Sequence, residues 1–154
     1  MNEIDNIVLH KEIDLIQACI TRMAHNSFLI KGWTLSIVAI VLSLATNKNS
    51  LFFELVLLVP VVGFWYLDAF FLRTEKMYRM MYEWVLKNRF KGNTDMLYDL
   101  NPTRFSSDAM SLGRVMRSVT LRWFYGIPLS VIIILILTNL PFIKKLYHCI
   151  LECM

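Results

Sequence analysis

Three long apolar blocks constrain the fold of this 154-residue chain more than any other feature. Apolar residues make up 56% of the chain and charged residues only 18%, and the charged residues gather between the blocks. The blocks cover residues 30–46, 51–72 and 123–143. A helix rises about 1.5 Å per residue, so about 20 apolar residues cross the roughly 30 Å hydrocarbon core of a bilayer. The first block is the shortest, but it can extend backward through residues 26–29.

The sequence therefore predicts an all-α integral membrane protein with about three transmembrane helices. Only the short turn 47–50 separates the first two blocks, which predicts a helical hairpin. We divide the chain into an amphipathic helix (1–27), the transmembrane hairpin (28–72), a basic helical segment (73–118), and the third span with its carboxyl-terminal tail (119–154).

Basic residues flanking the spans predict the orientation. Residues 73–117 contain nine Lys or Arg, whereas the hairpin turn contains one, Lys48. The positive-inside tendency therefore places the basic segment and the amino terminus in the cytoplasm, where they form a small helical layer. Three spans place the carboxyl terminus outside, but Lys144 and Lys145 disfavour that, so its side stays open.

The amino-terminal segment predicts a helix with an apolar seam. The seam residues are spaced four, three, four and three, as on a coiled-coil face. They are Leu9, Ile13, Ile16, Ile20 and Met23, and the predicted opposite side carries Lys11, Glu12, Asp14 and Gln17. No Pro or Gly separates this helix from the first span, which favours one continuous helix. The seam either packs on its own chain or assembles several copies around a common axis.

The basic segment begins with a predicted helix over residues 73–90. Opposite charges four residues apart, such as Glu75 and Arg79, support it. Gly92 is expected to end this helix. Ser106 or Ser107 is expected to cap a further helix over residues 108–118 that leads into the third span.

The pattern of reactive side chains disfavours an enzyme and predicts no cofactor and no metal. The His and Cys residues are scattered, without a spacing typical of a metal site or a nucleophile. The acids of the second span, Glu54 and Asp68, lie 14 residues apart, or about 21 Å along a helix, so they cannot act on one bond. We expect Glu54 to reach water at the outer end and Asp68 to pair with Arg73, and a pore or gate role for either acid is the alternative.

A polar stripe follows one side of the first helix. It consists of Arg22, Asn26, Ser36, Ser43 and Asn47. Small and hydroxyl residues mediate close helix packing in membranes, so packing is one interpretation. Pore lining is the other. One chain has too few helices to enclose water, so a pore requires a homo-oligomer of four or more copies.

The basic segment is also a candidate ligand site. Its cations alternate with aromatic residues, a combination suited to nucleotides or single-stranded nucleic acid. The cations are Arg73, Lys76, Arg79, Lys87, Arg89, Lys91, Arg114 and Arg117, and the aromatic residues are Tyr78, Tyr82, Trp84, Phe90 and Tyr98. The same charges suit anionic lipid headgroups, or they reflect membrane topology alone.

Residues 20–33 contain the pattern RMxxNSFxxKxW and lead into a hairpin of spans. This pattern resembles small membrane effectors of bacterial antiphage defence, of the Hailong type, and the resemblance covers mainly residues 10–73. It implies a homo-oligomeric ion channel in the bacterial inner membrane. The ligand would be a single-stranded oligonucleotide made by a partner nucleotidyltransferase, and the basic layer would bind it. A non-conducting scaffold that recruits a partner and a holin-like toxin are the alternatives.

Overall fold

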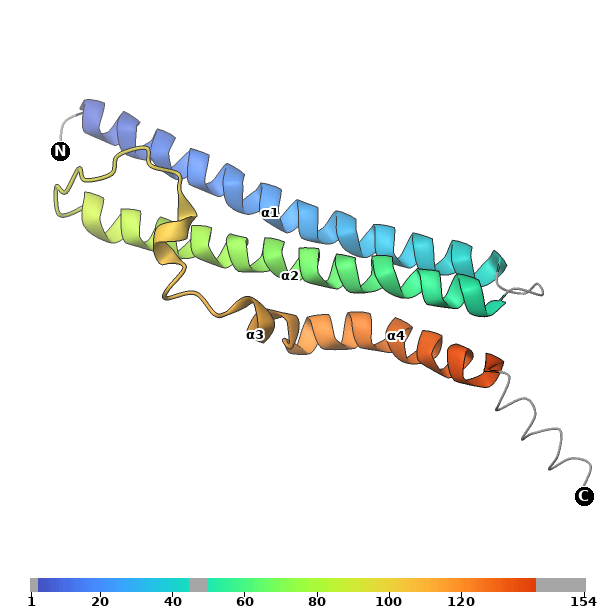
Figure 1. Cartoon of the computed structure of the whole chain (residues 1–154). Coiled ribbons are helices and arrows are strands. Elements are labelled where there is room, and N and C mark those ends of the chain that lie inside the picture. Colours follow the sequence, from blue (N-terminus) through green and yellow to red (C-terminus); the bar gives the residue numbers. More distant parts are fainter. Residues whose placement is uncertain (1–2, 45–49, 141–154) are drawn as a thin grey trace, which may run out of the picture. The chain divides into compact units, whose positions relative to one another are not determined.

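The computed structural model describes residues 3–44 and 50–140, and these form helices joined by turns, with no strand among them (Figure 1). The elements are α1 (Glu3–Leu44), α2 (Ser50–Arg89), the 3₁₀ helix η1 (Pro102–Phe105), α3 (Leu112–Met116) and α4 (Val119–Asn139). Three helical stretches are long and apolar enough to cross a membrane: Asn6–Ser43, Leu51–Arg89 and Val119–Asn139. The all-α fold with three membrane-spanning candidates is confirmed, and the chain is a membrane protein.

Helices α1 and α2 are longer than a bilayer requires. They have 42 and 40 residues, which corresponds to about 63 and 60 Å, or twice the roughly 30 Å hydrocarbon core. The predicted boundary between residues 27 and 28 falls inside α1, and the boundary between 72 and 73 falls inside α2. Neither position has a Pro or Gly that would end a helix, so the helical hydrogen bonding continues.

The chain divides into two compact units, and α1 and α2 contribute to both. Residues 1–29 and 68–115 form one unit, which contains most of the charged residues and is here called the charged unit. Residues 30–67 and 116–154 form the other, here called the apolar unit. In the described part of the apolar unit, the charged side chains are Lys31, Glu54, Arg117 and Arg122.

The predicted seam of α1 packs inside the charged unit. A core of buried side chains joins α1 to α2, and further seam residues pack against it. The core consists of Leu9, Ile16, Cys19, Tyr78, Met81 and Val85, with Ile13, Ile20 and Met23 partly buried beside it. This packing agrees with the interpretation in which the seam packs on its own chain.

The end of α2 follows the predicted stop. Gly92 has a φ of +76°, the left-handed region that Gly adopts without steric cost. Its N–H donates to the Arg89 carbonyl at 2.9 Å, and the Asn93 N–H donates to the Asn88 carbonyl at 3.2 Å. These bonds satisfy two of the carbonyls that the end of α2 leaves without a helical partner.

The predicted helix over residues 108–118 is wrong in its extent, because only α3 forms there. Arg73 explains the difference, since its Nε donates to the Met110 carbonyl at 3.0 Å and its Nη2 to the Ser106 carbonyl at 3.1 Å. A helix through this stretch would use the Met110 carbonyl to bind the Arg114 N–H, which instead bonds Ser111. Ser106 ends η1, and the cap at the start of η1 is Asn101.

In the apolar unit, α2 and α4 share a core. Leu57 and Val61 of α2 and Leu121, Tyr125 and Ile132 of α4 are buried there. The Trp65 ring stacks on Tyr125 with centroids 6.1 Å apart, and its Nε1 donates to the Met116 carbonyl at 3.1 Å. Helix α4 begins four residues earlier than the predicted third span, and residues 141–143 of that span lie outside the described residues.

Candidate functional site

The charged unit contains a buried ion pair, between Glu12 and Arg89. Glu12 is 1% exposed, and its two carboxylate oxygens accept from Arg89 Nε and Nη2, each at 2.8 Å. Arg89 Nη1 also donates to the carbonyls of Asn93 and Asp95, at 2.7 and 2.9 Å. The Tyr98 N–H donates to Glu12 at 3.3 Å. The hydrogen bonds to Glu12 raise the pKa of the Arg89 guanidinium, which keeps its positive charge.

Glu12 corrects the prediction for α1. The sequence places it opposite the seam, but the structure buries it on the seam face. The spacing explains this, since Leu9, Glu12 and Ile16 are three and four residues apart and therefore share one face. Two apolar seam residues at that spacing are the signal that could have identified Glu12 as a buried residue of the seam face.

The structure assigns two of the eight predicted ligand cations to internal roles. Arg89 belongs to the ion pair, and Arg73 holds the loop carbonyls of Ser106 and Met110. Arg117 belongs to the apolar unit and is exposed there. The charged unit keeps the other five on its surface or partly buried: Lys76, Arg79, Lys87, Lys91 and Arg114.

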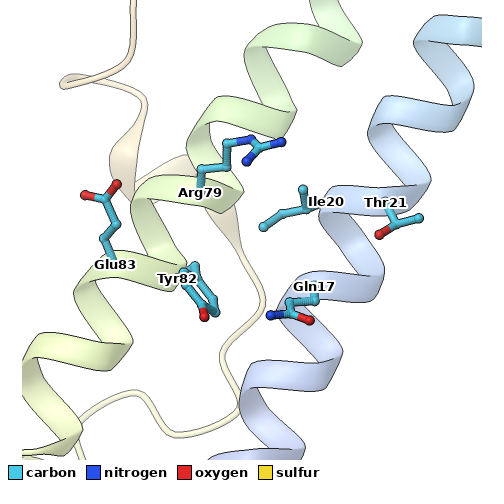
Figure 2. A pocket seen from close by; sticks show the side chains of 6 residues that line it. All are labelled: Gln17, Ile20, Thr21, Arg79, Tyr82 and Glu83. Atoms are coloured by element: carbon cyan, nitrogen blue, oxygen red, sulfur yellow. The ribbon is translucent and has the colours of Figure 1, made fainter.

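A pocket of about 470 Å³ lies between α1 and α2 in the charged unit (Figure 2). Figure 2 shows Arg79 and Tyr82 extending from α2 toward the α1 side chains Gln17 and Ile20. The pocket is lined by Gln17, Ile20, Thr21, Arg79, Tyr82 and Glu83. Arg79 also pairs with Glu75 at 2.7 Å, although its side chain is 61% exposed. Arg79 and Tyr82 were predicted for a ligand site, whereas Gln17 and Thr21 were not.

A second cavity, of about 550 Å³, lies in the charged unit beside the end of α2. Its lining includes Lys91, Gly92 and Asn93, together with Phe90, which is 68% exposed. Lys91 is thus another predicted ligand cation that borders a cavity. Arg89 also borders it, but its guanidinium is occupied by Glu12.

The polar stripe proposed for pore lining is mostly exposed in the single chain. Arg22, Ser36 and Ser43 are exposed and Asn26 is half-buried, while Asn47 lies outside the described residues. The Ser36 hydroxyl donates to the Gly32 carbonyl at 3.0 Å, and the Ser43 hydroxyl to the Ala39 carbonyl at 2.8 Å, both within α1. Exposure on one chain fits either a lipid-facing surface or a contact between copies.

Asp68 is fully buried in the charged unit and bonds to α1. Ser27, 4% exposed, donates its hydroxyl to Asp68 Oδ1 at 2.5 Å. The sequence predicted Arg73 as the partner of Asp68, whereas the described bonds of the Arg73 guanidinium go to loop carbonyls. The Ser27–Asp68 bond therefore joins α1 to α2 at a position where sequence reasoning expected a contact within α2.

Glu54 is buried in the apolar unit, which corrects the expectation that it reaches water. It is 2% exposed, and its Oε1 accepts from Asn139 Nδ2 at 2.6 Å. Its Oε2 is enclosed and has no hydrogen-bond partner among the described residues. Glu54 shares a helix face with the buried residues Leu57 and Val61, three and seven positions further on, which is why packing removes it from water.

Comparisons with protein-family models, with curated proteins and with solved structures give no match to this chain. Among residues 3–44 and 50–140, no three His, Cys, Asp or Glu side chains gather as metal ligands. The described part therefore offers three features for function: the pocket at Arg79 and Tyr82, the Glu12–Arg89 ion pair, and the buried Glu54.

Proposed function

We propose that the protein is a homo-oligomeric membrane channel, or a membrane-disrupting effector, controlled by an anionic ligand in the charged unit. One observation carries this proposal: the pocket lies between α1 and α2, and each of these helices continues without interruption into the apolar unit. A ligand that changes the packing of α1 against α2 therefore acts on the two helices that build the membrane part. Three spans cannot enclose water, so a conducting path requires four or more copies.

The topology we propose places the charged unit in the cytoplasm of a bacterium and the apolar unit in its inner membrane. The nine basic residues of segment 73–117 support this orientation through the positive-inside tendency. The lengths of α1 and α2 support it as well, because about half of each helix exceeds the hydrocarbon thickness. The resemblance of residues 20–33 to antiphage effectors suggests a role in defence.

The ligand class follows from the side chains of the pocket. Arg79 suits a phosphate, the Tyr82 ring suits stacking on a base, and Gln17 suits hydrogen bonds to a base edge. A volume of about 470 Å³ lies within the range of small-molecule sites. We propose a nucleotide or a single-stranded oligonucleotide, supplied by a partner nucleotidyltransferase.

Ion flux from liposomes tests the proposal. Purified protein is reconstituted, and the release of trapped ions is measured with and without single-stranded oligonucleotides. Flux should depend on the ligand, and Arg79→Ala combined with Tyr82→Ala should abolish the dependence. Arg114→Ala is the matched control, because Arg114 is an exposed cation of the same unit that does not line the pocket.

The copy number provides a second test. Light scattering of detergent-purified protein, corrected for detergent, should give a discrete assembly of four or more copies. A monomer or dimer without flux would overturn the channel and favour a non-conducting scaffold that recruits a partner. Such a scaffold needs no contact between copies, and the seam packs inside one chain.

A holin-like toxin differs from both the ligand-controlled channel and the scaffold, since it would kill cells without a ligand. Charge reversal of Arg79 would leave such toxicity intact, whereas it should alter the gating of a ligand-controlled channel. Cell survival after induced expression, with and without this reversal, distinguishes the two.

A further inference from the structure

Three side chains that combine an aromatic ring with a polar N–H or O–H group are exposed on the described part of the apolar unit, one on each long helix. They are Trp33 of α1, Tyr66 of α2 and Trp123 of α4, which are 62%, 50% and 62% exposed. Such a side chain has an apolar body and a polar end, so it is most stable where hydrocarbon meets water. The packed neighbours of these rings along the chain define the level at which each ring lies.

Two contacts bring these neighbours together. Lys31 Nζ lies 6.0 Å from the centre of the Phe124 ring. The Trp65 and Tyr125 rings stack with centroids 6.1 Å apart. The three helices are therefore level with one another at these residues. Each exposed ring is one or two residues away from one of these side chains, so it lies within about one turn of this level and, at about 100° per residue, points away from the contact.

The surface of the apolar unit changes in character at this level. Residues 34–44, 50–64 and 126–140 contain one charged side chain, Glu54, and it is 2% exposed. Helix α4 continues for 16 residues beyond Trp123, or about 24 Å, which is most of the roughly 30 Å hydrocarbon core of a bilayer. The surface beyond this level therefore suits hydrocarbon, and the exposed rings lie at its edge.

Basic side chains lie at or near this edge. Arg122 is exposed beside Trp123, and Arg117 is exposed two residues before α4 begins. Neither forms an ion pair with another described residue. Asp68, two residues beyond Tyr66, is fully buried, so no described carboxylate is exposed at this edge. Exposed cations at the edge of a hydrocarbon-facing surface are complementary to negatively charged lipid headgroups.

We propose that Trp33, Tyr66 and Trp123 form an interfacial girdle, and that Arg122 and Arg117 bind the phosphate group of an anionic phospholipid beside it. The guanidinium groups donate charge-assisted hydrogen bonds to the phosphate oxygens. The rings pack against the part of the acyl chains next to the headgroup, while their N–H and O–H groups reach water. This site depends neither on ion conduction nor on the pocket of the charged unit.

Quenching of tryptophan fluorescence by brominated phospholipids tests the girdle. The full-length protein is reconstituted in phosphatidylcholine brominated near the headgroup end or near the methyl end of its acyl chains, and the intensity lost on bromination is measured. Bromines near the headgroup should cause the larger loss, and Trp33→Phe and Trp123→Phe should each reduce it. Trp84→Phe is the matched control and should not change this loss, because Trp84 belongs to the charged unit and lies under the Arg104 guanidinium. A loss that depends on neither Trp33 nor Trp123 would overturn the girdle and favour a contact between copies.

Competition between two brominated lipids tests the headgroup site. In mixed vesicles, phosphatidylglycerol should bind more tightly than phosphatidylcholine with the same bromination. Arg122→Gln should reduce the ratio of the two association constants by about fivefold, the factor expected for one basic residue near a membrane surface, whereas Arg122→Lys should retain it. Lys87→Gln is the matched control, because Lys87 is an exposed cation of the charged unit, 22 residues or about 33 Å along α2 from Trp65.

Two outcomes of this competition would overturn the headgroup site. One is equal binding of both lipids by the wild-type protein, since the exposed cations would then select no anionic lipid. The other is an equal effect of Arg122→Gln and Lys87→Gln, which would show attraction by the overall charge of the protein rather than by a site at Arg122.

Discussion

Glu12 and Glu54 are buried to nearly the same extent, 1% and 2% exposed, yet their surroundings differ completely. Glu12 has a guanidinium on both oxygens and a backbone N–H in addition. Glu54 has one neutral amide on one oxygen. A buried carboxyl group is stabilised by a partner of opposite charge and by further hydrogen bonds, which Glu12 has and Glu54 lacks among the described residues. Burial alone therefore does not determine the surroundings of a carboxyl group.

The difference follows the composition of the two units. The charged unit has many basic residues, and the turn after α2 places the carbonyls of residues 93 and 95 on the Arg89 guanidinium, which also binds Glu12. The apolar unit has few charges, and packing with Leu57 and Val61 decides where Glu54 lies. The Glu12 carboxylate holds Arg89 at the turn after α2, and the Glu54 carboxyl group joins α2 to α4.

The largest expected effect comes from breaking the ion pair of the charged unit. Arg89→Ala leaves Glu12 buried without its counter-charge and should lower the free energy of unfolding by about 3–5 kcal/mol. Chemical denaturation in detergent, followed by circular dichroism, measures it. The double variant Glu12→Leu with Arg89→Met removes both charges and should recover most of the loss. A loss below about 1 kcal/mol in the single variant would contradict a paired, buried Glu12.

A smaller loss of the free energy of unfolding is expected when the partner of Glu54 is removed. Asn139→Leu removes the single described partner of Glu54 and should cost about 1–3 kcal/mol, the usual range for an unsatisfied buried group. The double variant with Glu54→Leu should be close to wild type, because both polar groups are then absent. Thr138→Val is the matched control, since the Thr138 hydroxyl donates to the Leu135 carbonyl in its own helix. Thermal unfolding in detergent measures all three variants.

Tyr78 extends the comparison to a buried acid of the charged unit on which the nearby cation Arg22 acts less strongly than burial does. Burial raises the pKa of Tyr78 above its usual 10.0, and the nearby Cys19 thiol raises it further. The folded state therefore holds the phenol proton more tightly than the unfolded state. The resulting stability is present in full below about pH 10 and is lost as pH rises through the folded-state pKa.

Unfolding measured across alkaline pH checks this expectation. Wild type should lose stability above about pH 10 more steeply than Tyr78→Phe, which has no proton to release. Tyr98→Phe is the control, because the Tyr98 side chain is 42% exposed. Identical pH dependence in wild type and Tyr78→Phe would contradict the burial of the phenol.

The smallest effect on stability is expected at the exposed pair of Arg79 and Glu75. Arg79→Ala should change the free energy of unfolding by less than about 0.5 kcal/mol, since exposed pairs four residues apart in a helix contribute little. Under the proposed function it should still weaken oligonucleotide binding by about tenfold or more, the loss of one charge-assisted hydrogen bond. Calorimetric titration against Arg114→Ala separates the two effects. An unchanged affinity would show that the oligonucleotide does not bind in this pocket.

Several features of the fold follow from local sequence. The three apolar blocks predict three membrane-spanning helices, and the absence of Pro or Gly near residues 27 and 72 keeps α1 and α2 continuous. Gly92 predicts the end of α2 because a left-handed residue is needed there. Length, apolar content and backbone preference act within a few turns of a helix, so each is readable without knowing what packs nearby.

The site was less predictable. Arg79 and Tyr82 were expected near a ligand, but Gln17 and Thr21 enter the pocket only because the seam of α1 packs on α2. Arg73 and Arg89 looked like ligand cations, and their bonds to loop carbonyls and to Glu12 depend on contacts 33 to 77 residues apart. No local pattern distinguishes a cation facing solvent from one facing a buried carboxylate.

The sequence by itself determined the class of protein, the three long apolar helices and the segregation of charge, since these depend on composition and on periodicity along the chain. Only the tertiary structure decided which polar groups are buried, and with which partners. It placed Glu12 against Arg89 and left one oxygen of Glu54 without a described partner. The physical reason is that the cost of a buried polar group depends on partners far away in sequence, and those partners are defined when the helices pack.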